Sequence, residues 1–175
     1  AALDVISYDD RMVDAIVHTA QRTGFNGRWQ QISDSPVTIV DIGHNEHGLK
    51  YNFAQLQRMK DEGNCTHIIM VYGSVADKDV DSVIHLMPED AVYVFTQAQG
   101  KRALPATAVY EKYCAYCASV CRSVANAHVA PGVAEAVALA RELAAGILTG
   151  DPFARPLIYI GGSTYVVSEA VALDW

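Results

Sequence analysis

The sequence predicts an α/β domain built on a mostly parallel sheet with helices on both faces. Short runs of consecutive apolar residues, rich in Val and Ile, recur along the chain, as expected for strands that are buried on both faces. Longer segments with apolar residues at helical spacing separate these runs, and Gly, Pro, Asn or Asp mark most boundaries. A length of 175 residues suits one domain with a substantial core.

The first expected element is a helix over residues 9–23, where apolar residues recur at helical spacing and Gly24 provides a stop. A turn then leads into a short extended segment over 28–32. Residues 1–24 are therefore predicted to form a leading helix, or interdomain arm, and residues 25–175 are predicted to form the domain itself.

After this segment, strands and helices alternate. Strands are expected at the apolar runs 37–41, 66–72, 91–95, 123–127 and 157–160, of which 123–127 has the weakest pattern. Helices are expected between and after them, over about 46–60, 80–87, 106–119 and 132–148 and from Thr164 onward. Turn and stop residues separate these elements at Gly63, Pro88, Pro105, Pro131 and Gly150. Alternation of this kind indicates a parallel sheet of Rossmann-like type, in one domain without internal repeats.

Charge and hydropathy limit the classes of partner that the protein can have. The formal net charge is −7 and no basic run is longer than Lys101-Arg102, which disfavours nucleic acid, because its binding depends on basic patches. No stretch approaches the ~20 apolar residues of a membrane span. The first residues lack the basic and apolar regions of a signal peptide. A cytoplasmic protein with neither a nucleic-acid nor a membrane partner is expected.

The four cysteines are Cys65, Cys114, Cys117 and Cys121. The last three are spaced by three and four residues, which predicts one helix face with small apolar residues in a buried stripe. A zinc or redox site is the alternative, but zinc would need a fourth ligand that this pattern does not supply. No metal ligand is predicted.

Polar residues gather in the predicted strand-to-helix loops. In a parallel sheet these loops all lie at one edge, where open α/β domains bind their ligands. The polar residues at that edge are Asp41, His44, Asn45, Asp77, Lys78, Asp79, Lys101, Arg102, His128 and Ser163. Such a rim of mixed charge suits an anionic small molecule.

Two of these residues have more than one interpretation. Asp41 can accept hydrogen bonds from a ribose or cap the following helix, and the pattern does not decide between them. His44 and His47 are three residues apart and could bind zinc, although they lack the H-E-x-x-H arrangement. A hydrogen-bonding His44 at the edge of a ligand is favoured over a metal ligand.

The polar runs of two other loops also have more than one interpretation. The run Asp77-Lys78-Asp79 can be a helix cap with a surface ion pair, which contributes only about 0–1 kcal/mol. The run Gly161-Gly162-Ser163 offers backbone N–H groups and a hydroxyl to an anion, although a plain N-cap would look the same.

Several nucleotide and hydrolase motifs are missing from the chain. It contains no G-x-G-x-x-G, no G-x-x-x-x-G-K-[ST] and no G-x-S-x-G. The domain therefore lacks a phosphate-cradling loop of its own. We expect it to form one half of a site that grips a nucleotide or another anion.

Five motifs on this edge resemble those of the C-terminal domain of folylpolyglutamate synthase/dihydrofolate synthase, in the Mur ligase superfamily. In chain order they are Gly27-Arg28-Trp29-Gln30, resembling G-R-x-Q; Asp41-Ile42-Gly43-His44-Asn45, resembling D-x-A-H-N; 73–79, resembling G-x-x-x-D-K-D; Phe95-Thr96 with Arg102-Ala103; and 161–165, resembling G-S-x-[YF]. The resemblance covers residues 24 to 173. Two departures, Gly43 for alanine and Glu46 for a frequent proline, remove no functional group.

The resemblance implies an ATP-dependent ligase. Members activate a carboxylate of a pteroate or folate as an acyl phosphate, which the amine of glutamate then attacks. A larger N-terminal domain holds the P-loop, the Mg²⁺ ligands and most folate contacts, and the C-terminal domain closes over it. The chain is accordingly expected to have this domain as its partner, and to be inactive without it.

The resemblance also implies roles for single residues. Arg28 would reach the ATP phosphates, and Asp41 would contact the nucleotide through its ribose. His44, as the catalytic residue, and Ser163 would lie near the acyl phosphate and the incoming glutamate. On the same substrate side, Asp77 and Lys78 would support the edge.

Three alternatives remain beside this one. The chain could be the closing domain of another Mur-type amino-acid ligase. It could be a stand-alone small-molecule-binding module that never meets a partner domain. It could also be a generic flavodoxin-like domain whose cysteines bind a metal.

Overall fold

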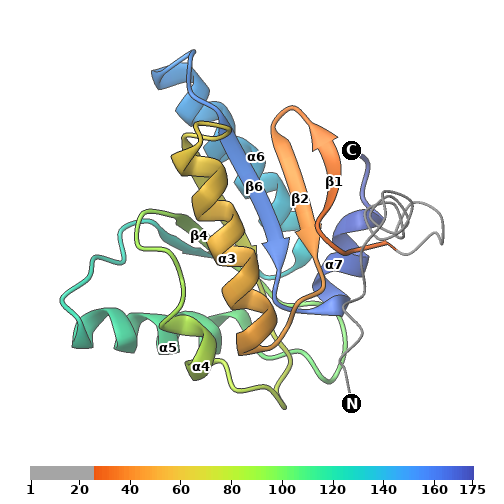
Figure 1. Cartoon of the computed structure of the whole chain (residues 1–175). Helices are drawn as coiled ribbons and strands as arrows, with labels where there is room; N and C mark the ends of the chain where they lie inside the picture. The colour runs from red at the N-terminus through yellow and green to blue at the C-terminus, as the bar shows by residue number, and fades with distance from the viewer. Residues whose placement is uncertain (1–25) are drawn as a thin grey trace, which may run out of the picture.

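A computed structural model describes residues 26–175, which form a six-stranded sheet in the order β1-β2-β6-β3-β4-β5 (Figure 1). The strands are β1 (Gln30–Asp34), β2 (Val37–Asp41), β3 (His67–Tyr72), β4 (Val92–Phe95), β5 (Ala127–Val129) and β6 (Pro156–Gly161). Only the β1–β2 pair of this sheet is antiparallel. The helix expected over 9–23, in the leading arm 1–24, lies outside the described residues.

Helices cover both faces of the sheet, as the sequence predicts. They are α3 (Glu46–Asp61), α4 (Asp81–Ile84), α5 (Ala106–Ser119), α6 (Val133–Gly150) and α7 (Thr164–Val171). Figure 1 shows α3 in front of the strands and α6 behind them. None of the helices in the described part of the chain combines the length and the apolar composition that crossing a membrane requires.

Two hydrophobic cores lie on the two faces of the sheet. One contains Ile39 and Met70 together with residues of α3, α4 and α5. The other contains their neighbours Val40 and Ile69, packed against α6 and α7. Successive side chains of a strand point to opposite faces, so a strand between two helical layers needs consecutive apolar residues. This requirement explains the unbroken apolar runs in the sequence and confirms the predicted fold class.

Most predicted elements match, and two differ for identifiable reasons. Strand β5 lies at Ala127–Val129 and not at 123–127, because its register is set by pairing of Ala127 with Tyr93 of β4. Helix α4 covers only Asp81–Ile84, where 80–87 was expected. Pro88 disfavours helical backbone at the residue before it, so the segment ends in turns.

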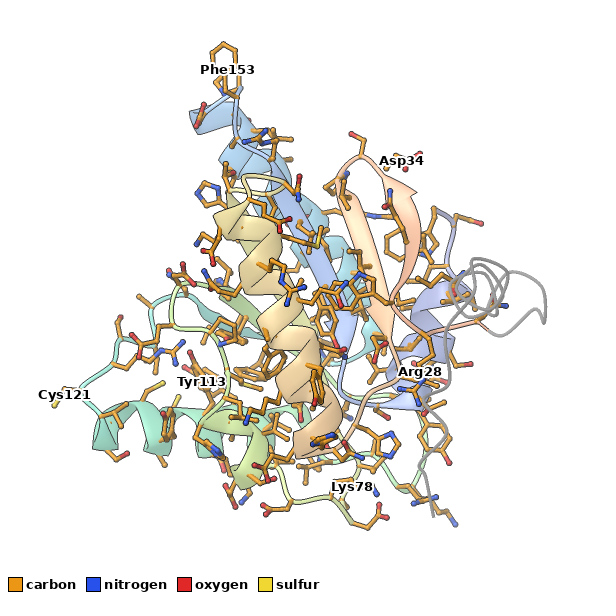
Figure 2. The ribbon with its side chains drawn as sticks, viewed as in Figure 1. Arg28, Asp34, Lys78, Tyr113, Cys121 and Phe153 are labelled. Atoms are coloured by element: carbon orange, nitrogen blue, oxygen red, sulfur yellow. The ribbon has the colours of Figure 1, made fainter. Side chains whose placement is uncertain are left out.

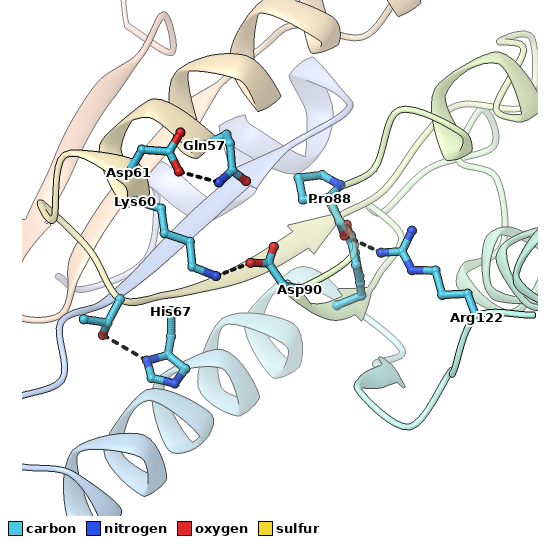
Figure 3. Close-up of polar contacts among 9 residues, drawn as sticks. Gln57, Lys60, Asp61, His67, Pro88, Asp90 and Arg122 are labelled. Carbon is cyan, nitrogen blue, oxygen red and sulfur yellow. Dashed lines mark hydrogen bonds and ion pairs between the residues drawn. The ribbon is translucent and has the colours of Figure 1, made fainter.

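Long polar side chains fasten the turn before β4 to its neighbours (Figure 3). Lys60, in the last turn of α3, forms an ion pair with Asp90. Arg122, beyond α5, donates to the carbonyl oxygens of Met87 and Pro88, and its guanidinium lies 5.7 Å from the centre of the Tyr113 ring. The turn that starts β4 is thereby attached to both α3 and α5.

The Lys60–Asp90 pair makes a prediction about acid stability. The hydrogen-bonded ammonium of Lys60 lowers the pKa of Asp90 below its ordinary value. The pair therefore stabilises the fold above the unfolded-state pKa of about 4, and this contribution is lost as the pH falls through the folded-state pKa. Because Asp90 is half exposed, Asp90→Asn should lower the free energy of unfolding by less than about 1 kcal/mol at pH 7. Urea denaturation should show a smaller effect at about pH 3; an equal effect at both pH values would contradict this assignment.

Candidate functional site

Loops from four parallel strands meet at the carboxyl edge of the sheet and enclose a cavity of about 370 Å³. The residues that line it are His44, Val75, Lys78, Arg102, Ser163, Thr164 and Tyr165. Four polar residues that the sequence places at this edge are thus brought together from the loops after β2, β3, β4 and β6: His44, Lys78, Arg102 and Ser163. The volume lies within the usual range for small-molecule sites, about 300–1,000 Å³.

The lining of this cavity is cationic. Lys78 and Arg102 both line it, and no carboxylate does so among the described residues. The chain as a whole carries a formal net charge of −7, so the lining of this cavity differs in sign from the net charge of the chain. A cleft lined by charges of one sign attracts ligands of the opposite sign. The cavity is therefore suited to an anion.

Asp41, at the end of β2, is almost fully buried, with 4% of its surface exposed. One oxygen accepts the Gly43 N–H at 2.6 Å and the Asn52 side-chain amide at 2.8 Å. The other accepts the Trp29 N–H at 2.8 Å. Asp41 does not cap the following helix, because Asn45 occupies the N-cap and accepts the Gly48 N–H at 2.8 Å. Of its two interpretations, the capping role is wrong.

Asn52 and Tyr159 extend the Asp41 network into the core. The Asn52 amide also donates to the Tyr159 hydroxyl at 2.9 Å, on the neighbouring strand β6. Burial, and then the charge of Asp41, raises the pKa of Tyr159, which keeps the phenol neutral. Sequence reasoning missed both residues, since an amide inside a helix and a tyrosine inside a strand carry no local signal of a shared contact.

The segment that carries Arg28 is fastened to the same loop. The Ile42 N–H donates to the Gly27 carbonyl at 2.7 Å, in addition to the bond between Trp29 and Asp41. Gly27 has a φ of +89°, which only glycine adopts easily, and an added Cβ would lie 2.8 Å from the Ile42 side chain. Arg28 is exposed and lies at the same edge as Lys78 (Figure 2), but it does not line the cavity.

His44 is held by a backbone hydrogen bond. Its Nδ1 lies 3.0 Å from the Ile42 carbonyl oxygen, which can only accept, so Nδ1 carries the proton. In the neutral ring, Nε2 is then left as the acceptor. His47 instead packs edge-on against Tyr51, with ring centres 5.0 Å apart. In residues 26–175, no three His, Cys, Asp or Glu side chains gather as a metal site would require.

Ser163 closes the cavity at the start of α7. It is buried, and its oxygen accepts the Tyr165 N–H at 3.2 Å, so Ser163 is the N-cap of this helix. The bond uses the hydroxyl as an acceptor and leaves its O–H as a donor for a ligand. The preceding Gly162 has a φ of +90°, and an added Cβ would lie 2.4 Å from the Tyr72 ring. Only glycine therefore fits this turn.

The run 77–79 contains the expected helix cap, but its ion pair is formed with a residue of another loop and not within the run. Asp79 accepts the N–H groups of Asp81 and Ser82 at the start of α4. Asp77 pairs with Arg102 of the next loop, at 3.0 Å between Oδ2 and Nη2. Hydrogen bonding to its own backbone, and then the nearby guanidinium, lowers the pKa of Asp77. Asp77 does not line the cavity, and Arg102, to which the sequence assigned no role, does.

The cysteines do not form the predicted common stripe. Cys117 is buried and Cys114 is half buried, but Cys121 is exposed and has a φ of +55°. Helix α5 ends at Ser119, so Cys121 lies beyond the helix and loses the periodicity on which the prediction rested. Cys65 is buried before β3, where burial raises the pKa of its thiol.

Comparisons with known proteins agree on one group of enzymes. The family described as "Mur ligase, glutamate ligase domain" matches residues 27–150. A dihydrofolate synthase/folylpolyglutamate synthase of Buchnera aphidicola subsp. Baizongia pistaciae is 33% identical over 58 residues, covering 33% of this chain and 13% of that protein.

Solved structures of similar fold are longer than this chain. Mycobacterium tuberculosis folylpolyglutamate synthase complexed with ADP has a TM-score of 0.67 and 22% identity over 85% of this chain and 32% of its own. A bifunctional folylpolyglutamate synthase/dihydrofolate synthase from Yersinia pestis, complexed with AMPPNP and Mn, has a TM-score of 0.62 and 21% identity over 96% of this chain and 35% of its own. The chain thus spans about a third of the length of the structures it matches.

The Asp41 network makes a prediction about stability. Asp41→Ala should lower the free energy of unfolding by about 3 kcal/mol or more, because each buried donor left without an acceptor costs about 1–3 kcal/mol. Asp34→Ala is the matched control, since Asp34 is an exposed carboxylate at the opposite end of the β1–β2 hairpin (Figure 2). Its effect should stay within about 0.5 kcal/mol. Urea denaturation measures both, and similar losses would contradict the role given to Asp41.

Proposed function

The chain belongs to the Mur ligase, glutamate ligase domain family, and we propose that it is the C-terminal domain of an ATP-dependent folate ligase. The ligase would add glutamate to a carboxylate of folate or dihydropteroate through an acyl phosphate. The observation that carries the proposal is the cationic cavity lined by His44, Lys78 and Ser163. The similarity to dihydrofolate synthase/folylpolyglutamate synthase favours a folate acceptor over those of other Mur-type ligases.

The proposed ligase needs a second domain. The chain has no P-loop motif and spans about a third of the length of the enzymes it matches, which supports an N-terminal ATPase domain as its partner. ATP supplies the phosphoryl group that activates the carboxylate. In residues 26–175 no three His, Cys, Asp or Glu side chains gather at one place, and we assign the Mg²⁺ ligands to the N-terminal domain, as the resemblance implies.

Arg28 and Asp41 are assigned to the nucleotide. The exposed guanidinium of Arg28 has a planar fork that can bond two phosphate oxygens. The two oxygens of Asp41 offer about four lone-pair sites, of which the fold uses three. One site is left for a ribose hydroxyl. The same carboxylate fixes the segment that carries Arg28, so the two assignments support each other.

His44, Lys78 and Ser163 are assigned to the acyl phosphate and the glutamate. The ammonium of Lys78 pairs with a substrate carboxylate, and the O–H of Ser163 donates to the negative charge that builds up during amine attack. Because Nδ1 of His44 is committed to the Ile42 carbonyl, Nε2 is the nitrogen that accepts a proton from the attacking amine. Asp77 takes part indirectly, through its pair with Arg102.

Closure of the two domains would complete the site. An acyl phosphate hydrolyses in water, and a domain that covers it excludes solvent and orients the amine. The proposal places the protein in the cytoplasm, with ATP, glutamate and folate or dihydropteroate as partners. It assigns no role to nucleic acid or to a membrane.

The function is tested by joining this chain to its N-terminal ATPase domain. ATP-dependent incorporation of labelled glutamate into a folate or dihydropteroate should require both domains, and the 175-residue chain alone should show none. Incorporation by the chain alone would contradict the division of labour. No incorporation by the joined protein with either acceptor would contradict the proposed activity.

Arg28→Ala tests the nucleotide assignment in the joined protein. Loss of one charge-assisted contact to phosphate should weaken the use of ATP by about 1.5–3 kcal/mol, roughly tenfold or more in kcat/KM for ATP. The KM for glutamate should change little. Arg155→Ala is the matched control, because Arg155 is exposed at the opposite edge, just before β6. Equal kinetics for the two variants would contradict the role of Arg28.

A further inference from the structure

Arg102 lies between two adjoining cavities on the carboxyl edge. It lines the 370 Å³ cavity described above together with Lys78. It also lines a second cavity of about 150 Å³, formed by residues 98–103 and Tyr165. Arg102 and Tyr165 are shared by both linings. Arg102, whose side chain is largely exposed, therefore borders both the cavity assigned to glutamate and the space beside it.

The backbone at Arg102 is fixed by the neighbouring loop. The Arg102 carbonyl accepts the Ala76 N–H at 2.9 Å, and the Leu104 N–H donates to the Ser74 carbonyl at 2.9 Å. Val75 and Ala103 form an antiparallel bridge between these two contacts. The loop after β4 is thus paired with the loop after β3, and this pairing places Arg102 beside the loop that carries Lys78.

The side chain of Arg102 is oriented as well. Asp77 accepts from Nη2 at 3.0 Å, and the charge of Asp77, followed by the nearby phenol of Tyr165, raises the pKa of Arg102. A guanidinium has five N–H donors, and the pair with Asp77 leaves others for a ligand. An anchored donor fork loses less freedom on binding than a free side chain does.

We propose that Arg102 binds the second carboxylate of the amino-acid substrate and thereby selects a dicarboxylic amino acid. This inference rests on the proposed function. When the amine of glutamate forms the amide bond, both carboxylates remain ionised, and the cavity offers two cations, Lys78 and Arg102, to hold them. An amino acid with a neutral amide side chain would make no charge-assisted contact with Arg102, so it would bind more weakly.

Asp77 acts as a positioning residue in this arrangement. Its own charge would repel a substrate carboxylate, but its carboxylate is directed to the guanidinium and does not line the cavity. The pair joins the loops after β3 and β4, so it holds one cation at a defined place relative to the other. The sequence places Asp77 on the substrate side of the edge, in a supporting role, and we assign the direct contact with the substrate to Arg102.

The test is an NMR titration of the isotope-labelled 175-residue chain. L-glutamate, L-glutamine and inorganic phosphate are added in separate experiments, and the shifts of the amides of 161–165 give each Kd. The wild-type chain should bind glutamate about tenfold more tightly than glutamine, as expected for one charge-assisted contact. Arg102→Gln should abolish this preference by weakening glutamate about tenfold while changing glutamine less than about twofold.

Two further variants isolate the cause. Arg102→Lys keeps the charge without the fork and should recover part of the preference. Arg155→Ala removes an exposed guanidinium at the opposite edge and should leave every Kd unchanged. A variant that merely perturbs the fold would weaken the binding of glutamate and of glutamine alike, and so would not change the ratio of their Kd values.

Three outcomes would overturn the inference. The wild-type chain could fail to bind glutamate or to prefer it over glutamine, or Arg102→Gln could keep the preference. If Arg102→Gln weakens the binding of phosphate as strongly as that of glutamate and leaves the preference intact, the anion at Arg102 is a phosphate.

The joined two-domain protein separates this inference from the proposed function. Ligation with unchanged amino-acid preference in Arg102→Gln defeats only the inference, whereas absence of ligation in the wild type defeats the proposed function.

Discussion

The Asp41 carboxylate accepts hydrogen bonds from three segments that meet at the carboxyl edge of the sheet. Trp29 belongs to the segment before β1, Gly43 to the loop after β2, and Asn52 to α3. Because the carboxylate is buried, water cannot take its place as the acceptor for these three donors. Moving any of the segments would leave a donor unpaired, so the three segments keep one relative position. The places of Arg28 and of the His44 loop therefore both depend on this one group.

The loops after β3 and β4, which also line the cavity, are joined without a buried charge. Backbone pairing between 74–76 and 102–104 joins two loops, and the Asp77–Arg102 pair adds a contact at their surface. Exposed ion pairs of this kind add little to the stability of a fold, so the effect of this pair is to hold the Arg102 guanidinium in place. The resulting surface has cations, a hydroxyl and an imidazole, which is the chemistry that the proposed function requires of one half of a site.

The resemblance to the Mur ligase C-terminal domain, seen first in five short motifs, is confirmed by the family match and by the shared fold. The predicted α/β architecture is confirmed as well. The errors have a common character. The strand expected over 123–127 and the cysteine stripe each extended a local pattern too far: pairing with β4 sets the register of β5, and α5 ends at Ser119, before Cys121. The pattern left Asp41 open between a ligand contact and a helix cap, and Asn45 takes the cap.

The sequence by itself determined the alternation of strands and helices, because apolar runs and helical spacing are properties of neighbouring residues. It also determined where most of the polar residues of the carboxyl edge lie, since strand direction alone assigns each loop to an edge. His128, expected in such a loop, lies instead within β5, because that strand is shifted toward the C-terminus. Only the tertiary structure decided which of the polar residues touch. Asp41 meets Asn52, eleven residues away, and Arg102 meets Asp77, twenty-five residues away. Such pairs depend on how separate elements approach one another in space, and no local spacing encodes that approach.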